Sequence, residues 1–176
     1  MKNRMGLVFA MLVIAGSPAS LKAARGPADS QLAPQSVSSV KAGETLLTAG
    51  QRQAAIDAFE AALAADPRNI RAYLGLARAA EADGLPGKAV RFYREALQID
   101  PNDVTALELQ GNALVMRGAT ARAEANLERL KTVCATPCPS ADRLRASIAK
   151  GPPAPVIAAA DSKVAGKSAA LDAPKP

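Results

Sequence analysis

The chain has 176 residues and a net charge of +6; 49% of its residues are hydrophobic, only 3% are aromatic, and histidine and tryptophan are absent. This aliphatic composition favours closely packed helices over a β-sandwich, and the lack of histidine, the commonest general base and metal ligand, argues against most hydrolases and metalloenzymes. The charge is spread thinly, with 15 basic and 13 acidic side chains in residues 36–150, and without a basic stripe or interleaved aromatic residues we expect no nucleic-acid binding.

Residues 1–19 have the pattern of a secretory signal peptide. Lys2 and Arg4 precede an apolar run over residues 5–16, and small residues lead to a cut after about Ala19. The run is shorter than the roughly 20 residues of a spanning helix, so we expect no stable membrane span after cleavage. The alanine-rich style of the chain favours the bacterial periplasm, with secretion into the medium as the second choice.

Two segments without apolar periodicity flank the central part of the chain. Residues 20–35 are expected to form a flexible leader, and the Ala/Pro-rich residues 151–176 a disordered tail. The central residues 36–150 are therefore expected to hold the folded domain.

An internal repeat of 34 residues organises that domain. Glycines recur at 50, 84 and 118, alanines at 55, 89 and 123, and large apolar residues at 59, 93 and 127. The pair Asp-Pro recurs at 66–67 and 100–101, and a column of small residues comprises Gly43, Ala77 and Gly111. Several coincident columns at one period indicate three units, residues 36–69, 70–103 and 104–137.

The period and its columns resemble the tetratricopeptide repeat family. The middle unit is most similar to the family's pattern, at Tyr73, Leu76, Ala77, Gly84, Ala89, Tyr93, Ala96 and Pro101. The first unit departs from it at Ser39, where the family has an aromatic residue. The resemblance implies an all-α solenoid of about three helix-turn-helix units.

The physical pattern of each unit agrees with a helix pair. In the middle unit we expect helices over about residues 70–82, with Asn69 as N-cap, and 87–99. Glycine at 84 and 118 fits the chain reversal between paired helices, and proline at 67 and 101 ends a unit. Because no unit can bury its own apolar stripe, the three must stack.

Residues 140–150 are predicted to form an amphipathic helix that caps the last unit. Ser140 is placed to begin it and Gly151 to end it, while Leu144 and Ile148 lie one turn apart on one face. Arg143, Arg145 and Lys150 are expected to face solvent. The alternative is a loose polar helix without a packing partner.

Cys134 and Cys138 are the only cysteines, and in an exported chain they favour a disulfide. The bridge would close a short loop and hold the capping helix against the third unit. A metal site would need about four ligands, which the chain does not offer here. A redox-active pair more often has two intervening residues rather than three.

The resemblance implies a partner-binding groove lined by the first helix of each unit. Carried over residue by residue, its positions are Val40, Glu44, Leu47, Arg71, Leu74, Arg78, Glu81, Glu108, Asn112, Val115 and Met116. Arg71 or Arg78 is suited to fork onto a carboxylate of a bound peptide, with Asn112 as a backbone partner. Any one of these residues can also be an ordinary solvated side chain. The family's carboxylate-clamp pattern, with Lys and Asn on the first repeat, is not matched.

No catalytic constellation and no cofactor site is predicted. The first hypothesis is a non-enzymatic scaffold of the cell envelope that binds a protein or peptide in the groove. The second is a redox or chaperone-like accessory acting through Cys134 and Cys138. A third is a homo-oligomer whose groove accepts a neighbour's tail.

Overall fold

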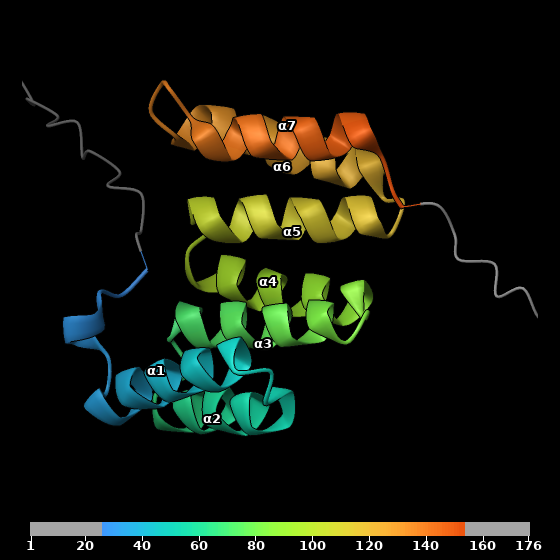
Figure 1. Cartoon of the computed structure of the whole chain (residues 1–176). Coiled ribbons are helices and arrows are strands. Elements are labelled where there is room, and N and C mark those ends of the chain that lie inside the picture. The colour runs from blue at the N-terminus through green and yellow to red at the C-terminus, as the bar shows by residue number, and fades with distance from the viewer. Residues whose placement is uncertain (1–25, 154–176) are drawn as a thin grey trace, which may run out of the picture.

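The structure is a computed structural model that describes residues 26–153, and within that range the chain forms seven α-helices and no strand. In chain order the elements are η1 (Asp29–Gln31), α1 (Pro34–Thr48), α2 (Arg52–Ala65), α3 (Ile70–Ala82), α4 (Pro86–Ile99), α5 (Val104–Met116), α6 (Thr120–Val133) and α7 (Pro139–Lys150). Neighbouring helices pack as pairs that stack on one another, and α7 covers the last pair (Figure 1). The predicted all-α solenoid of three units and a capping helix is confirmed. The predicted signal peptide, and the predicted tail from residue 154 onward, lie outside the described residues.

Each helix pair reverses direction at a glycine with positive φ, at 76° for Gly50, 69° for Gly84 and 72° for Gly118. In the middle unit the Leu85 amide donates to the Ala80 carbonyl at 2.9 Å, and the Gly84 amide donates to the Glu81 carbonyl at 2.9 Å. These bonds satisfy carbonyls that the end of α3 leaves unpaired, and the left-handed residue between them must be one without a Cβ. The glycine column of the repeat is thus explained.

The junctions between units are closed by aspartates. Asp66 accepts the Arg68 amide at 3.0 Å, and Asp100 accepts the Asn102 amide at 2.9 Å. Both residues are almost fully buried, so the turn that their carboxylates stabilise is shielded from water. The same position in the third unit, again 34 residues further on, is Cys134.

The core depends on a close approach of helices across unit boundaries. Phe59 of α2 is fully buried, and its ring lies against both Gly43 of α1 and Gly75 of α3. A Cβ placed on Gly43 would come within 2.6 Å of the ring, well inside contact distance. One large side chain therefore fills the space that two missing side chains leave.

Helix capping differs between units. Asn69 precedes α3 as predicted, but its side chain makes no capping bond; its Nδ2 donates instead to Ser36 Oγ at 2.8 Å, in the interior. In the next unit Asp103 does cap its helix, accepting the Ala106 amide at 2.7 Å. Asn69 is 1% exposed, so it is a buried tie between the first two units rather than an N-cap.

The predicted flexible leader, residues 20–35, needs a correction over its second half. Helix α1 already begins at Pro34, whose fixed φ suits the first helical turn. Residues 26–33, which we call the N-terminal segment, lie along the side of the stack where α3 and α5 begin (Figure 1). Leu32 is buried there. Residues 20–25 lie outside the described range.

The capping helix packs as the sequence predicts. Leu144 is fully buried in a cluster with Leu107, Leu127 and Leu130, and Ile148 lies against it. Gly111 of α5 leaves the space that the Leu144 side chain occupies. Gly151 ends the helix with a φ of 74°. Ser140 is not the N-cap, because α7 begins one residue earlier, at Pro139, after Cys138.

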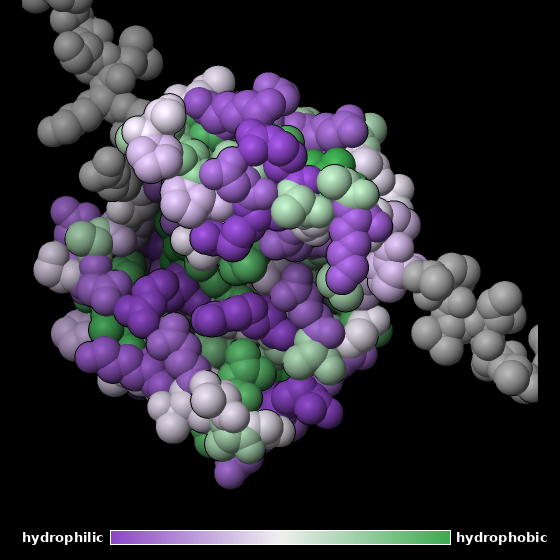
Figure 2. Space-filling model, turned by 45° about the horizontal axis from the view of Figure 1, so that its top comes forward, coloured by the Kyte–Doolittle hydropathy of each residue, from purple (hydrophilic) through white to green (hydrophobic). Residues whose placement is uncertain are grey.

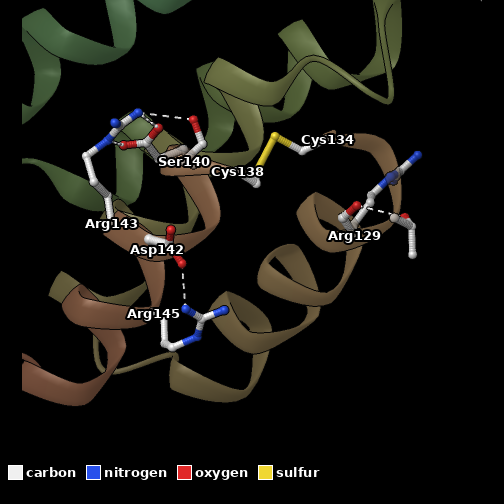
Figure 3. The surroundings of a disulfide bond; sticks show 9 residues. Arg129, Cys134, Cys138, Ser140, Asp142, Arg143 and Arg145 are labelled. Atoms are coloured by element: carbon white, nitrogen blue, oxygen red, sulfur yellow. Dashed lines mark hydrogen bonds and ion pairs between the residues drawn. A yellow bond between two sulfur atoms is a disulfide. The ribbon is translucent and has the colours of Figure 1, made fainter. Parts of the chain in front are cut away.

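A polar contact also fixes α7 to α5. Arg143 forks onto Glu108, with Nε and Nη2 each donating to a carboxylate oxygen at 2.6 Å, and Nη2 also contacts Ser140 Oγ at 3.1 Å (Figure 3). Burial raises the pKa of Glu108, but the hydrogen bonds of Arg143 and Ser140 outweigh it, and the pKa is lowered overall. The expectation that Arg143 only faces solvent is therefore incomplete.

Cys134 and Cys138 lie at disulfide distance where α6 ends and α7 begins, as Figure 3 shows. Their Cα atoms are 5.7 Å apart. The bridge spans the loop between the last unit and the capping helix, which is the place of the predicted staple. Its contribution to stability stays a prediction.

We expect Gly75→Ala to lower the free energy of unfolding by about 1–3 kcal/mol, because the new methyl group would overlap the Phe59 ring. Gly87→Ala is the matched control: its Cβ would have no neighbour closer than Arg117 Nε at 3.6 Å, so the variant should be as stable as the natural chain or slightly more so. Urea denaturation followed by circular dichroism measures both. Equal stability of the two variants would contradict the packing argument.

We expect Glu108→Gln to lower the free energy of unfolding by about 1–2 kcal/mol at pH 7, since it breaks a charge-assisted fork. Because the folded-state pKa of Glu108 is depressed, this stabilisation is present above the carboxyl's ordinary value of 4.5 and is lost as the pH falls below it. The difference between variant and natural chain should therefore shrink towards pH 3. Arg145→Gln, which breaks only an exposed pair with Asp142 on the same helix, should change little. If the difference in free energy of unfolding between Glu108→Gln and the natural chain grew at low pH, this account would be refuted.

Candidate partner-binding surface

The first helices of the units share one face of the stack, and this face is divided in the middle. Helix α1 packs on α3, and α5 packs on α7, while α3 and α5 stand further apart. Figure 2 shows a hollow across the molecule, with apolar atoms at its floor and hydrophilic side chains along both sides. Such a hollow between helices is a common form of peptide-binding site.

Three apolar residues predicted to line the groove are core residues, which corrects the prediction. Val40 is 1% exposed and packs with Phe59, while Leu74 and Val115 are 8% and 2% exposed and share the cluster that joins α3 to α5. Helical periodicity places a residue on a face, but it does not distinguish the floor between two helices from their exposed sides. These residues support the surface without being accessible to a partner.

Glu108 is also wrongly placed among the partner-binding residues. It is 8% exposed, and both carboxylate oxygens are taken by Arg143. If a partner drew Arg143 away, the nearly buried carboxylate of Glu108 would be left without a counter-charge, which is costly. Glu108 therefore holds the capping helix.

The accessible part of the predicted surface is a cluster of three charged side chains on α1 and α3. Arg71 Nη2 donates to both carboxylate oxygens of Glu44, at 3.2 and 3.0 Å, and Arg78 Nη2 lies 3.6 Å from Glu44 Oε1. The side chains of Arg71 and Arg78 are 42% and 44% exposed. Two guanidinium groups thus share one carboxylate, and both retain donors that face solvent.

Glu81, also on α3, has a structural partner. The Tyr93 hydroxyl donates to its Oε2 at 3.1 Å. Burial raises the pKa of Glu81, and the hydrogen bond from Tyr93 and the charge of Arg78 only partly offset this. Burial and the charge of Glu81 likewise raise the pKa of the Tyr93 phenol. The pair links the groove side of α3 to the interior of the middle unit.

The remaining predicted residues are Leu47, Asn112 and Met116. Leu47 is half-buried against the cluster that contains Val40 and Phe59, while Met116 is 44% exposed at the end of α5. Asn112 is half-buried, and its Oδ1 has no hydrogen-bond partner within residues 26–153. Met116 is therefore accessible on the α5 side of the hollow, whereas the Oδ1 atom of Asn112 is buried.

The sequence prediction missed the N-terminal segment as part of this surface. Its Asp29 pairs with Arg71 at 3.0 Å, so the guanidinium is held from two sides. Beneath it lies a cavity of about 260 Å³, bordered by residues 26–29, the start of α3, and Asp100, Asp103 and Thr105. Residues 26–33 show no apolar periodicity that would predict their packing on the domain. The only sequence signal for it is Leu32, the one large apolar residue among them.

The part of the chain that the structure describes offers neither a metal site nor a membrane-spanning helix. Residues 26–153 bring together no group of three or more cysteine and acidic side chains that could hold a metal ion. In the same range no helix is long and apolar enough to cross a membrane.

Comparison with known proteins gives a family and a fold. Residues 40–104 match the family model described as "Tetratricopeptide repeat", and no curated protein matches the sequence. Among solved structures, the chain is similar to the Sgt2 TPR domain from Aspergillus fumigatus, with 22% identity and a TM-score of 0.62, over 80% of this chain and 100% of that one.

Two further structures carry a bound peptide. The first TPR of Spaghetti (RPAP3), solved with an HSP90 peptide, is 19% identical with a TM-score of 0.60, covering 67% of this chain and 93% of that one. The Yersinia enterocolitica type III secretion chaperone SycD, solved with a peptide of the translocator YopD, is 20% identical with a TM-score of 0.56, covering 65% and 86%. At these identities the likeness concerns the fold. Together, the 34-residue period, the stacked helix pairs and the match of residues 40–104 to the family model show that the chain contains tetratricopeptide repeats.

Proposed function

We propose that this protein is a non-enzymatic scaffold of the bacterial cell envelope that binds a protein or peptide partner on the face formed by α1, α3 and α5. The observation that carries the proposal is the exposed cluster of Arg71, Arg78 and Glu44 beside a hollow with an apolar floor. Arginine forks onto carboxylates, and the exposed Met116 at the end of α5 offers an apolar contact to a bound segment.

The similar structures support this choice of ligand class. SycD was solved with a translocator peptide, Spaghetti with an HSP90 peptide, and the TPR2B domain of yeast Sti1 in a complex with Hsp70. Paired helices of this architecture thus accept peptide segments in several proteins. The partner of the present chain need not resemble any of these peptides.

The envelope location rests on residues 1–19, with their positive start, apolar run and small residues before Ala19. After cleavage of these residues, the repeat domain would then act outside the cytoplasmic membrane. A partner in the same compartment, such as a component of an envelope assembly, fits this location.

The test is crosslinking in intact cells, with the tagged chain captured and its partners identified by mass spectrometry. We expect one reproducible envelope partner, whose recovery falls about tenfold or more with Arg71→Ala/Arg78→Ala, because truncating two arginines at an interface typically costs over 1 kcal/mol. Arg91→Ala/Arg94→Ala, which removes two exposed arginines from α4 on the opposite side of the same unit, is the matched control. The captured chain itself should begin near Ser20.

Two results would overturn the proposal. Recovery of the partner that is unchanged by the Arg71/Arg78 variant would show that binding occurs elsewhere. Mixed disulfides with many proteins, lost when Cys134 and Cys138 are both changed to Ser, would favour the redox accessory instead.

A further inference from the structure

The N-terminal segment is bound to the repeat domain at both of its ends. The Gly26 amide donates to Asp100 Oδ2 at 2.9 Å, and the Ala33 amide donates to Asp66 Oδ2 at 3.2 Å. These two aspartates occupy the same place in successive units, 34 residues apart. The segment therefore bridges two unit junctions along the side of the stack where α3 and α5 begin (Figure 1).

Its middle residues make the contacts of a bound peptide. Asp29 pairs with Arg71, and the Gln31 carbonyl accepts a hydrogen bond from Arg68 Nη2 at 3.1 Å. Leu32, at 7% exposure, is the apolar residue that anchors the segment. Backbone hydrogen bonds, one charged contact and one apolar anchor are usual means by which a groove holds a peptide. The middle of this segment is the short 3-10 helix η1.

The segment fills its place incompletely. A pocket of about 260 Å³, open to solvent, lies between residues 26–29 and the domain. Residues 28–31 are all exposed. Little apolar surface is buried along the segment, so releasing it costs far less than unfolding a helix.

The charges indicate what would replace it. With Asp29 in place, Arg71 pairs with two carboxylates, Asp29 and Glu44, while Arg78 lies beside Glu44 and Glu81. If the segment leaves, Arg71 loses the carboxylate of Asp29 and keeps only that of Glu44, which it shares with Arg78. A competitor that brings its own carboxylate to Arg71 restores the balance.

We propose that residues 26–33 are an internal ligand that occupies the α3–α5 side of the groove, and that the partner displacing it is a peptide with a carboxylate for Arg71 and an apolar side chain for the place of Leu32. This inference rests on the proposed function in that the groove must take a partner. The inference adds that the segment competes with the partner. The apparent affinity for the partner is then lowered in proportion to the fraction of molecules whose groove is free.

The probe is a synthetic peptide with the sequence of residues 26–33, acetylated to keep the Gly26 amide and labelled at its C-terminus with fluorescein. Its binding is measured by fluorescence anisotropy on the purified chain and on Asp29→Asn/Leu32→Ser, which weakens the internal segment. We expect the variant to bind the probe at least about tenfold more tightly than the natural chain. A probe with Asn in place of its Asp should bind the variant several-fold more weakly, and adding Arg71→Ala to the variant should remove that preference.

Controls separate competition from damage. Asp29→Asn alone alters an exposed side chain and should give a smaller gain in the same direction, and the melting temperature of each variant reports whether the domain stays folded. Equal affinity of natural chain and variant, or no binding of the probe to a folded variant, would overturn the inference. Either failure leaves the partner capture that depends on Arg71 and Arg78 intact, so the two proposals are tested separately.

Discussion

The Phe59 ring lies between Gly43 and Gly75, and this contact sets how closely the first three helices approach. In the second unit the large buried residue is Tyr93, which shares a cluster with the small residue Ala77. In the third unit the large residue comes from the capping helix, where Leu144 takes the space that Gly111 leaves. Because each unit pairs one large side chain with a small one, successive helix pairs stack and the first helices share one face.

This stacking decides which side chains reach a partner. The apolar residues between α3 and α5 are buried at the floor of the hollow, so in the proposed function the polar residues around it determine specificity. Arg71 stands at the centre of that set, with Glu44 on one side and Asp29 of the N-terminal segment on the other. The groove and the segment that crosses it are therefore parts of one charge arrangement.

Features that repeat every 34 residues were predictable, and features formed by single long-range contacts were not. The period locates α3 at its observed bounds and α4 within one residue, because glycine turns and apolar stripes are local signals. It does not reveal that Arg143 reaches back to Glu108, or that the Gly26 amide finds Asp100, 74 residues away. The burial of Val40 was missed for a related reason, since a helical stripe does not show how wide its contact with the next helix is.

The unit junctions show how one position serves three purposes. Asp66 and Asp100 close their turns and also hold the two ends of the N-terminal segment. The third position is Cys134, whose partner Cys138 precedes the capping helix. Repetition supplied equivalent sites, and the chain uses the first two for the N-terminal segment and the third for the capping helix.

Hydrogen exchange of the purified chain, with and without its captured partner, tests the central claim that the partner binds the α3–α5 groove in place of residues 26–33. The account predicts slower exchange in α3 and α5 and faster exchange in residues 26–33, whose terminal amides lose Asp66 and Asp100. Slower exchange confined to α2, α4 and α6, with the N-terminal segment unchanged, would contradict it.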